Sequence, residues 1–126
     1  MKLKSQIPAI GLALGLVAGL PAATPAPGES PADHLPSHIR QVTWFGERAD
    51  WSHDGTRILF LSKTFGDARE LDLATKTIRN RTAHYPHHGY TRALYLSNGD
   101  LLLSGPEQFD PKQPGEARVQ CWLYVL

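Results

Sequence analysis

The apolar residues of this chain come in short runs separated by turn residues, which predicts β-strands. Ile58–Leu61 (ILFL) is wholly apolar, as in a strand buried on both faces. Glu70–Leu73 (ELDL) alternates polar and apolar residues with the period of a half-buried strand, so we expect Glu70 and Asp72 on its solvent side. Thr77–Thr82 is polar and contains two arginines, which is typical of an edge strand. The segment has no helical periodicity, so it is predicted to be a four-stranded unit.

The beginning of this unit is repeated further along the chain. Its first strand ends in the sequence WSHDG (51–55), where Asp-Gly predicts a tight turn. The second copy follows at an offset of about 44 residues, within the period of about 40–45 residues of a propeller blade. The matched positions are Arg48-Ala49 with Arg92-Ala93, Trp51 with Tyr95, and Asp54-Gly55 with Asn98-Gly99.

The turn WSHDG and the strands ILFLS and ELDL resemble the repeat of TolB-like, WD-like (WD40-like) β-propellers. In that family the turn is most often Ser-Pro-Asp-Gly, and His53 takes the place of the proline. The resemblance covers residues 40–126. It implies an all-β partial propeller of about two four-stranded antiparallel blades, about 47–82 and about 91–126, with Arg40–Trp44 as a further outer strand. Such propellers occur as periplasmic or secreted binding scaffolds and as gating domains of serine peptidases.

The residues before the repeats predict export. Residues 1–23 have a basic start with Lys2 and Lys4, an apolar core at Ile7–Leu20 and small residues at the end, which together indicate a signal peptide. A membrane anchor is the alternative, but the core is shorter than the ~20 residues of a span. Residues 24–39 form a Pro-rich linker. We expect a secreted or periplasmic protein that is not bound to a membrane after cleavage.

Length and charge narrow the possible partners. The chain has 126 residues, whereas a closed propeller needs at least about four blades of 40–45 residues. We therefore expect the N-terminal fragment of a longer propeller, or else self-association through open blade faces. The net charge of +1, with basic and acidic residues interleaved, gives no basic stripe and predicts no nucleic-acid partner.

The aromatic and sulfur side chains have simpler expected roles. The single cysteine, Cys121, excludes an internal disulfide and is expected to be a buried thiol. We expect Trp44, Trp51 and Trp122 to pack in the core or between blades. Gly105–Gly115 is rich in proline and glycine and is predicted to be a long surface loop.

The stretch between the repeats, His84–Tyr90 (HYPHHGY), holds the candidate site. Neutral imidazole is a good ligand for zinc or copper, but no cysteine or carboxylate joins the cluster locally. Three interpretations stay open, namely an inter-blade loop with packed histidines, a ligand-binding or pH-sensitive site, and a metal site. We predict neither a metal nor a cofactor. The predicted ligand-binding residues are His84, His87, His88, Tyr90 and Arg92.

The sequence predicts no enzyme activity in this chain. Ser52-His53-Asp54 holds the residue types of a catalytic triad, but adjacent residues cannot converge on one proton-transfer line. The Gly-x-Ser-x-Gly motif of a peptidase is absent. We expect a scaffold that binds a protein or a small ligand. The alternatives are the N-terminal propeller part of a larger, prolyl-oligopeptidase-like hydrolase and a propeller lyase with a His-bound metal.

Overall fold

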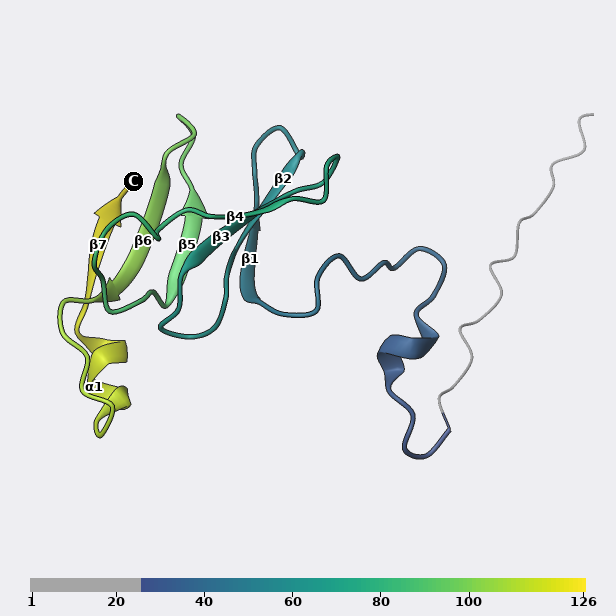
Figure 1. Ribbon diagram of the computed structural model, residues 1–126, viewed down its shortest axis with the longest axis horizontal. Coiled ribbons are helices and arrows are strands. Elements are labelled where there is room, and N and C mark those ends of the chain that lie inside the picture. Colours follow the sequence, from purple (N-terminus) through teal and green to yellow (C-terminus); the bar gives the residue numbers. More distant parts are fainter. Residues whose placement is uncertain (1–25) are drawn as a thin grey trace, which may run out of the picture. The chain divides into compact units, whose positions relative to one another are not determined.

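The structure, a computed structural model, describes residues 26–126 and divides at Gln41/Val42 into two compact units (Figure 1). The signal peptide predicted at 1–23 lies outside the described residues. The part of the predicted linker that is described contains one turn of 3-10 helix, η1 (Pro31–His34), where the Ser30 hydroxyl accepts a hydrogen bond from the Ala32 N–H. Within residues 26–126, no helix is long and apolar enough to cross a membrane.

The unit Val42–Leu126 consists of two antiparallel sheets and one short helix, so the all-β prediction is confirmed (Figure 1). In both sheets the spatial order of the strands is their order along the chain. The propeller that such sheets would build stays a prediction. The first sheet contains β1 (Glu47–Trp51), β2 (Arg57–Leu61), β3 (Ala68–Asp72) and β4 (Ile78–Asn80), and the second contains β5 (Arg92–Tyr95), β6 (Leu101–Pro106) and β7 (Cys121–Val125).

The second sheet has three strands where four are predicted, because β7 is its last strand. Two local elements also differ from the prediction. Arg40–Trp44 is not a strand, because the chain turns there: the Thr43 hydroxyl donates to the Phe45 carbonyl and accepts from the Phe45 N–H. This turn places the Phe45 ring 5.7 Å from that of Phe60. The loop predicted at Gly105–Gly115 runs into a helix, α1 (Pro114–Val119), whose six residues are too few to show a periodic pattern.

The hydrophobic core lies between the two sheets. Successive side chains of a strand point to opposite faces, so Leu59 and Leu61 on β2 share a face with Ala68 on β3. This face of the first sheet packs against β5 and β6, and β5 contacts both β1 and β2. The members of the cluster packed between the sheets, each at most 8% exposed, are Leu59, Leu61, Ala68, Tyr90, Ala93, Tyr95, Leu101 and Leu103.

Glu70 also lies on this inner face, so the expectation that it faces solvent is wrong. The residue is only 6% exposed. Its carboxylate accepts hydrogen bonds from Arg81 at 2.8 Å, from Arg57 at 3.4 Å and from the Tyr95 hydroxyl at 2.8 Å. Burial, followed by the bond to Glu70, raises the pKa of Tyr95. A second link is the Tyr95 N–H, which donates to the Asp50 carboxylate at 2.8 Å.

A backbone junction joins the sheets at their other end. Gly66 and Tyr90 form an isolated antiparallel bridge, in which the Tyr90 N–H donates to the Gly66 carbonyl at 3.0 Å. The Phe65 N–H donates to the Tyr90 carbonyl at 2.9 Å. Gly89 has a φ of +83°, and a Cβ there would collide with the Phe65 backbone. Only glycine allows this close approach, which fixes the start of β5 against the β2–β3 loop.

Leu61 provides a test of this core. Leu61→Ala removes a side chain with no exposed surface, and such truncations cost about 2–5 kcal/mol of unfolding free energy. Urea unfolding followed by circular dichroism measures the loss. The control, Val119→Ala, changes a side chain that is 82% exposed, and should stay within about 0.5 kcal/mol. Equal effects of the two substitutions would mean that this face is not buried in solution.

Candidate functional site

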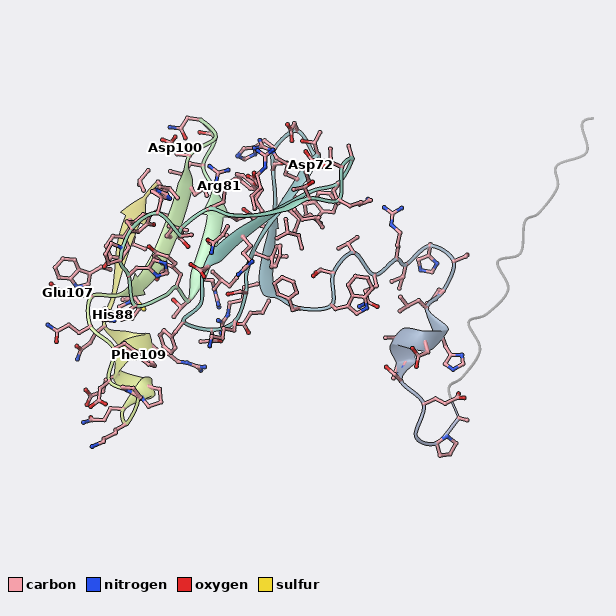
Figure 2. The ribbon with its side chains drawn as sticks, viewed as in Figure 1. Asp72, Arg81, His88, Asp100, Glu107 and Phe109 are labelled. Carbon is pink, nitrogen blue, oxygen red and sulfur yellow. The ribbon has the colours of Figure 1, made fainter. Side chains whose placement is uncertain are left out.

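The histidine-rich loop forms one wall of a pocket of about 400 Å³. The loop connects β4 to β5, and the opposite wall comes from the end of β6, the residue after it, and β7. Figure 2 shows His88 and Glu107 near each other on this side of the sheets. The lining residues are Tyr85, Pro86, His87, His88, Gly89, Tyr90, Pro106, Glu107 and Tyr124.

His87 is held by hydrogen bonds at both ring nitrogens. Its Nδ1 accepts from the Gly89 N–H at 2.8 Å, so in the neutral ring the proton sits on Nε2. That Nε2 lies 3.2 Å from the Asp67 carboxylate, to which it donates. A general base or a metal ligand needs a free nitrogen lone pair, and the only lone pair of this ring is engaged by Gly89. His87 therefore acts as a brace for the loop.

Asp67, the residue before β3, binds the His87 ring and so holds the loop. Its carboxylate also accepts a hydrogen bond from the Thr82 hydroxyl at 3.0 Å. Burial favours a higher pKa for Asp67, but hydrogen bonds from Thr82, Asn80 and His87 outweigh it and hold the pKa below its usual value. Asp67 is therefore ionised at neutral pH, and it ties two residues of the loop, Thr82 and His87, to the first sheet.

Three tyrosine rings line the pocket. The hydroxyls of Tyr85 and Tyr90 are hydrogen-bonded at 2.8 Å. Burial, and then the bond to Tyr85, raises the pKa of Tyr90, so its hydroxyl is neutral under physiological conditions. The Tyr124 ring packs edge-on against Tyr90 at 6.2 Å, and the His87 ring lies 4.8 Å from Tyr90. The wall is therefore a set of packed aromatic rings.

Glu107 is the only lining residue with a carboxylate, and no arginine or lysine is among the lining residues. Its side chain is exposed. An aromatic wall with one carboxylate has a negative electrostatic character, because the faces of aromatic rings are also negative. The pocket therefore suits a neutral or positively charged ligand.

The structure separates the five predicted ligand-binding residues. His87, His88 and Tyr90 line the pocket. The His84 ring is not part of the lining and packs edge-on against Tyr85 at 4.7 Å. Arg92 lies at a different depression of about 310 Å³, whose other lining residues are Arg48, Thr91 and Arg118. Ligand binding by these five residues stays a prediction.

Sequence reasoning missed Tyr85, Glu107 and Tyr124 as lining residues. Tyr85 stands inside the histidine-rich stretch, so its position was a usable signal. Glu107 and Tyr124 are far from that stretch in sequence. They reach it only because β6 pairs with β7 and Leu103 is paired with Tyr124, which no local pattern reveals.

The other candidate groups have structural roles. Ser52 donates to the Asp54 carboxylate at 2.6 Å, and this bond, with those from Thr56, lowers the pKa of Asp54; the three residues shape a turn. His53 is exposed beside it. Over residues 26–126, no group of three or more His, Cys, Asp or Glu side chains is placed to hold a metal ion.

Cys121 and the tryptophans are more exposed than expected. Cys121 is half-buried, and its thiol donates to the Ala117 carbonyl at 3.2 Å. Trp44, Trp51 and Trp122 are 91%, 59% and 56% exposed, so they do not pack in the core of this chain.

Comparison with protein-family models, curated proteins and solved structures finds no match for this chain. The role of the pocket therefore has to be argued from its own geometry. Its main features are the braced histidine, the tyrosine wall and the single carboxylate.

The Asp67 anchor predicts a specific dependence of stability on pH. A carboxyl group whose pKa is lowered by folding stabilises the fold above its unfolded value of 3.8, and this contribution is lost as the pH falls through the lower folded value. Asp67→Asn should therefore destabilise the protein at about pH 7 and have a smaller effect at about pH 2. Urea unfolding of both proteins at the two pH values measures this. An equal difference at both would contradict the lowered pKa.

Proposed function

We propose that the chain is a secreted or periplasmic binding scaffold of the TolB-like propeller type, whose pocket takes a small ligand with an ammonium group. The supporting observation is the lining of the pocket, with three tyrosine rings, one carboxylate and no basic side chain that carries a permanent charge. The two sheets serve as the rigid support, and the loop between β4 and β5 presents the binding residues.

The attraction for a cation has two sources. An ammonium group over the face of a tyrosine ring gains about 0.5–1 kcal/mol at an exposed site and more when water is excluded. Glu107 adds a charge of opposite sign to the lining of the pocket. Because the Tyr85 and Tyr90 hydroxyls are bonded to each other, the rings keep their positions, with their hydroxyls satisfied. Quaternary ammonium ligands are bound by such aromatic sites.

The site is also held in place before a ligand arrives. The Asp67–His87 bond, the Gly89–His87 bond and the Gly66–Tyr90 bridge fix the loop at three points. A preorganised site loses less conformational entropy on binding, which favours affinity. We propose no catalytic role for this site, since both nitrogens of its best-placed histidine are engaged.

Choline and its uncharged carbon isostere test the proposal, because they have nearly the same shape and differ in charge. NMR titration of the full chain should show that choline binds more tightly than the isostere and shifts the signals of Tyr90 and Tyr124. Glu107→Gln and Tyr124→Leu should each weaken choline about two- to fivefold, which corresponds to about 0.5–1 kcal/mol.

The matched control is Glu116→Gln, which removes an exposed carboxylate of α1 that does not line the pocket. It should leave choline affinity unchanged. Equal binding of choline and the isostere would contradict a cationic ligand. A lack of signal changes at the tyrosines with both compounds would contradict ligand binding in this pocket.

A further inference from the structure

Each sheet has an inner face toward the other sheet and an outer face with an apolar row. On the first sheet, paired residues place one row across all four strands, and its outermost member, Trp51, is 59% exposed. On the second sheet, a row crosses all three strands and is flanked by Leu123, which is 70% exposed. The first row is Trp51, Ile58, Leu71 and Ile78, and the second is Leu94, Leu102 and Val125.

The strand pairings show which faces of the two sheets are equivalent. Trp51 pairs with Ile58 on the outer face of the first sheet, and its counterpart Tyr95 pairs with Leu101 on the inner face of the second. In the same register, the inner pair Leu59–Glu70 corresponds to the outer pair Leu102–Val125. The two sheets are thus stacked in the same sense, with equivalent faces pointing in the same direction.

This equivalence defines how a further sheet would pack. The outer face of the second sheet is equivalent to the inner face of the first sheet. The outer face of the first sheet is equivalent to the inner face of the second sheet. One copy of the chain therefore carries both halves of an interface that already exists inside it.

We propose that the chain associates head-to-tail with a second copy, the outer face of the three-stranded sheet packing against the outer face of the four-stranded sheet. This proposal extends beyond the ligand pocket and does not depend on it.

The changes between equivalent positions are correlated across this proposed contact. Inside the chain, the Glu70 carboxylate meets the Tyr95 hydroxyl, and Asp50 accepts from the Tyr95 N–H. Between copies, Val125 and Leu94 stand in the positions of Glu70 and Asp50, and they would meet Trp51 in the position of Tyr95. A carboxylate that faces a hydroxyl inside the chain is replaced, between copies, by an aliphatic side chain that faces an indole. Both sides of the contact therefore change from polar to apolar together. Such matching favours a second copy over an unrelated partner.

A head-to-tail contact uses two different surfaces and continues until the rotation closes a ring or leaves a filament. Closed propellers contain about 4–8 blades, so a ring of two-sheet units would hold about two to four copies. Part of the outer face of the first sheet is already buried within the chain, since Phe60 is 3% and Leu71 2% exposed, and Phe45 packs against Phe60. Trp51 is the exposed end of this row and would make the main contact.

Sedimentation equilibrium tests the assembly, with the protein expressed from its full sequence in an exporting host and purified as processed there. The wild type should show about two to four times the monomer mass. Leu123→Asp on one face and Trp51→Asp on the other should each reduce it to the monomer. Val119→Asp places the same charge on an exposed residue of α1 and should keep the wild-type mass. Val125→Asp replaces Leu123→Asp if circular dichroism shows that the latter has lost its strands.

Mixing the two monomeric variants tests the head-to-tail geometry. Leu123→Asp keeps an intact first sheet and Trp51→Asp keeps an intact second sheet, so together they should form a one-to-one dimer that cannot grow. A wild type that stays monomeric up to about 100 μM would overturn the proposal, because its dissociation constant would then be above the micromolar range of a specific contact. So would a Trp51→Asp protein with the wild-type mass, or a mixture without dimers.

Discussion

The buried carboxylate of Glu70 is the contact on which the arrangement of the two sheets depends. An ionised carboxylate in a protein interior is costly unless its hydrogen-bonding capacity is satisfied. Two of its partners belong to the same part of the chain as the first sheet: Arg57 lies in β2 and Arg81 directly follows β4. The third partner, Tyr95, belongs to the second sheet. One carboxylate oxygen, Oε2, accepts all three bonds, and the bond from Tyr95 forms only when the sheets meet in one register. This requirement adds specificity to the apolar packing of Leu59, Leu61 and their partners.

The same register determines where the candidate site is formed. The β4–β5 loop has to cross from one sheet to the other, and its two ends are fixed by β4 and by the Gly66–Tyr90 bridge. Within that span, Asp67 holds His87, whose ring packs against the rings of Tyr85 and Tyr90. The pocket is therefore a consequence of how the sheets are joined. Its character, aromatic with one carboxylate, is determined by the few side chains at the junction.

Much of the fold could be predicted from short-range patterns. The apolar run 58–61, the alternation at 70–73 and the repeated turns each depend on residues close in sequence. The inward orientation of Glu70 could not be predicted, because an alternating strand has two faces and only the second sheet decides which is buried. The helix Pro114–Val119 is too short for a periodic signal, and the turn at Thr43 replaces a strand through one hydroxyl group.

The candidate site, like the fold, has a part that local sequence predicts and a part that depends on distant residues. The histidine stretch lies in a loop that lines the pocket, but the chemistry of the pocket depends on residues from elsewhere. Asp67, 20 residues before His87, determines that the imidazole is a brace, and Glu107 and Tyr124 arrive through strand pairing. The repeat of about 44 residues was visible in sequence, whereas the correlated change from Glu70 and Tyr95 to Val125 and Trp51 needs the register.

The most direct test of the central claim, that Glu70 and Tyr95 join the two sheets, is a double-mutant cycle. The unfolding free energies of the wild type, Glu70→Gln, Tyr95→Phe and the double variant are compared in urea. Contacting residues in one network couple by about 0.5–3 kcal/mol, and a bond of this kind to a charged group predicts a coupling of about 1 kcal/mol or more. Effects that simply add, within about 0.3–0.5 kcal/mol, would mean that the two side chains do not meet and that the sheets are packed differently.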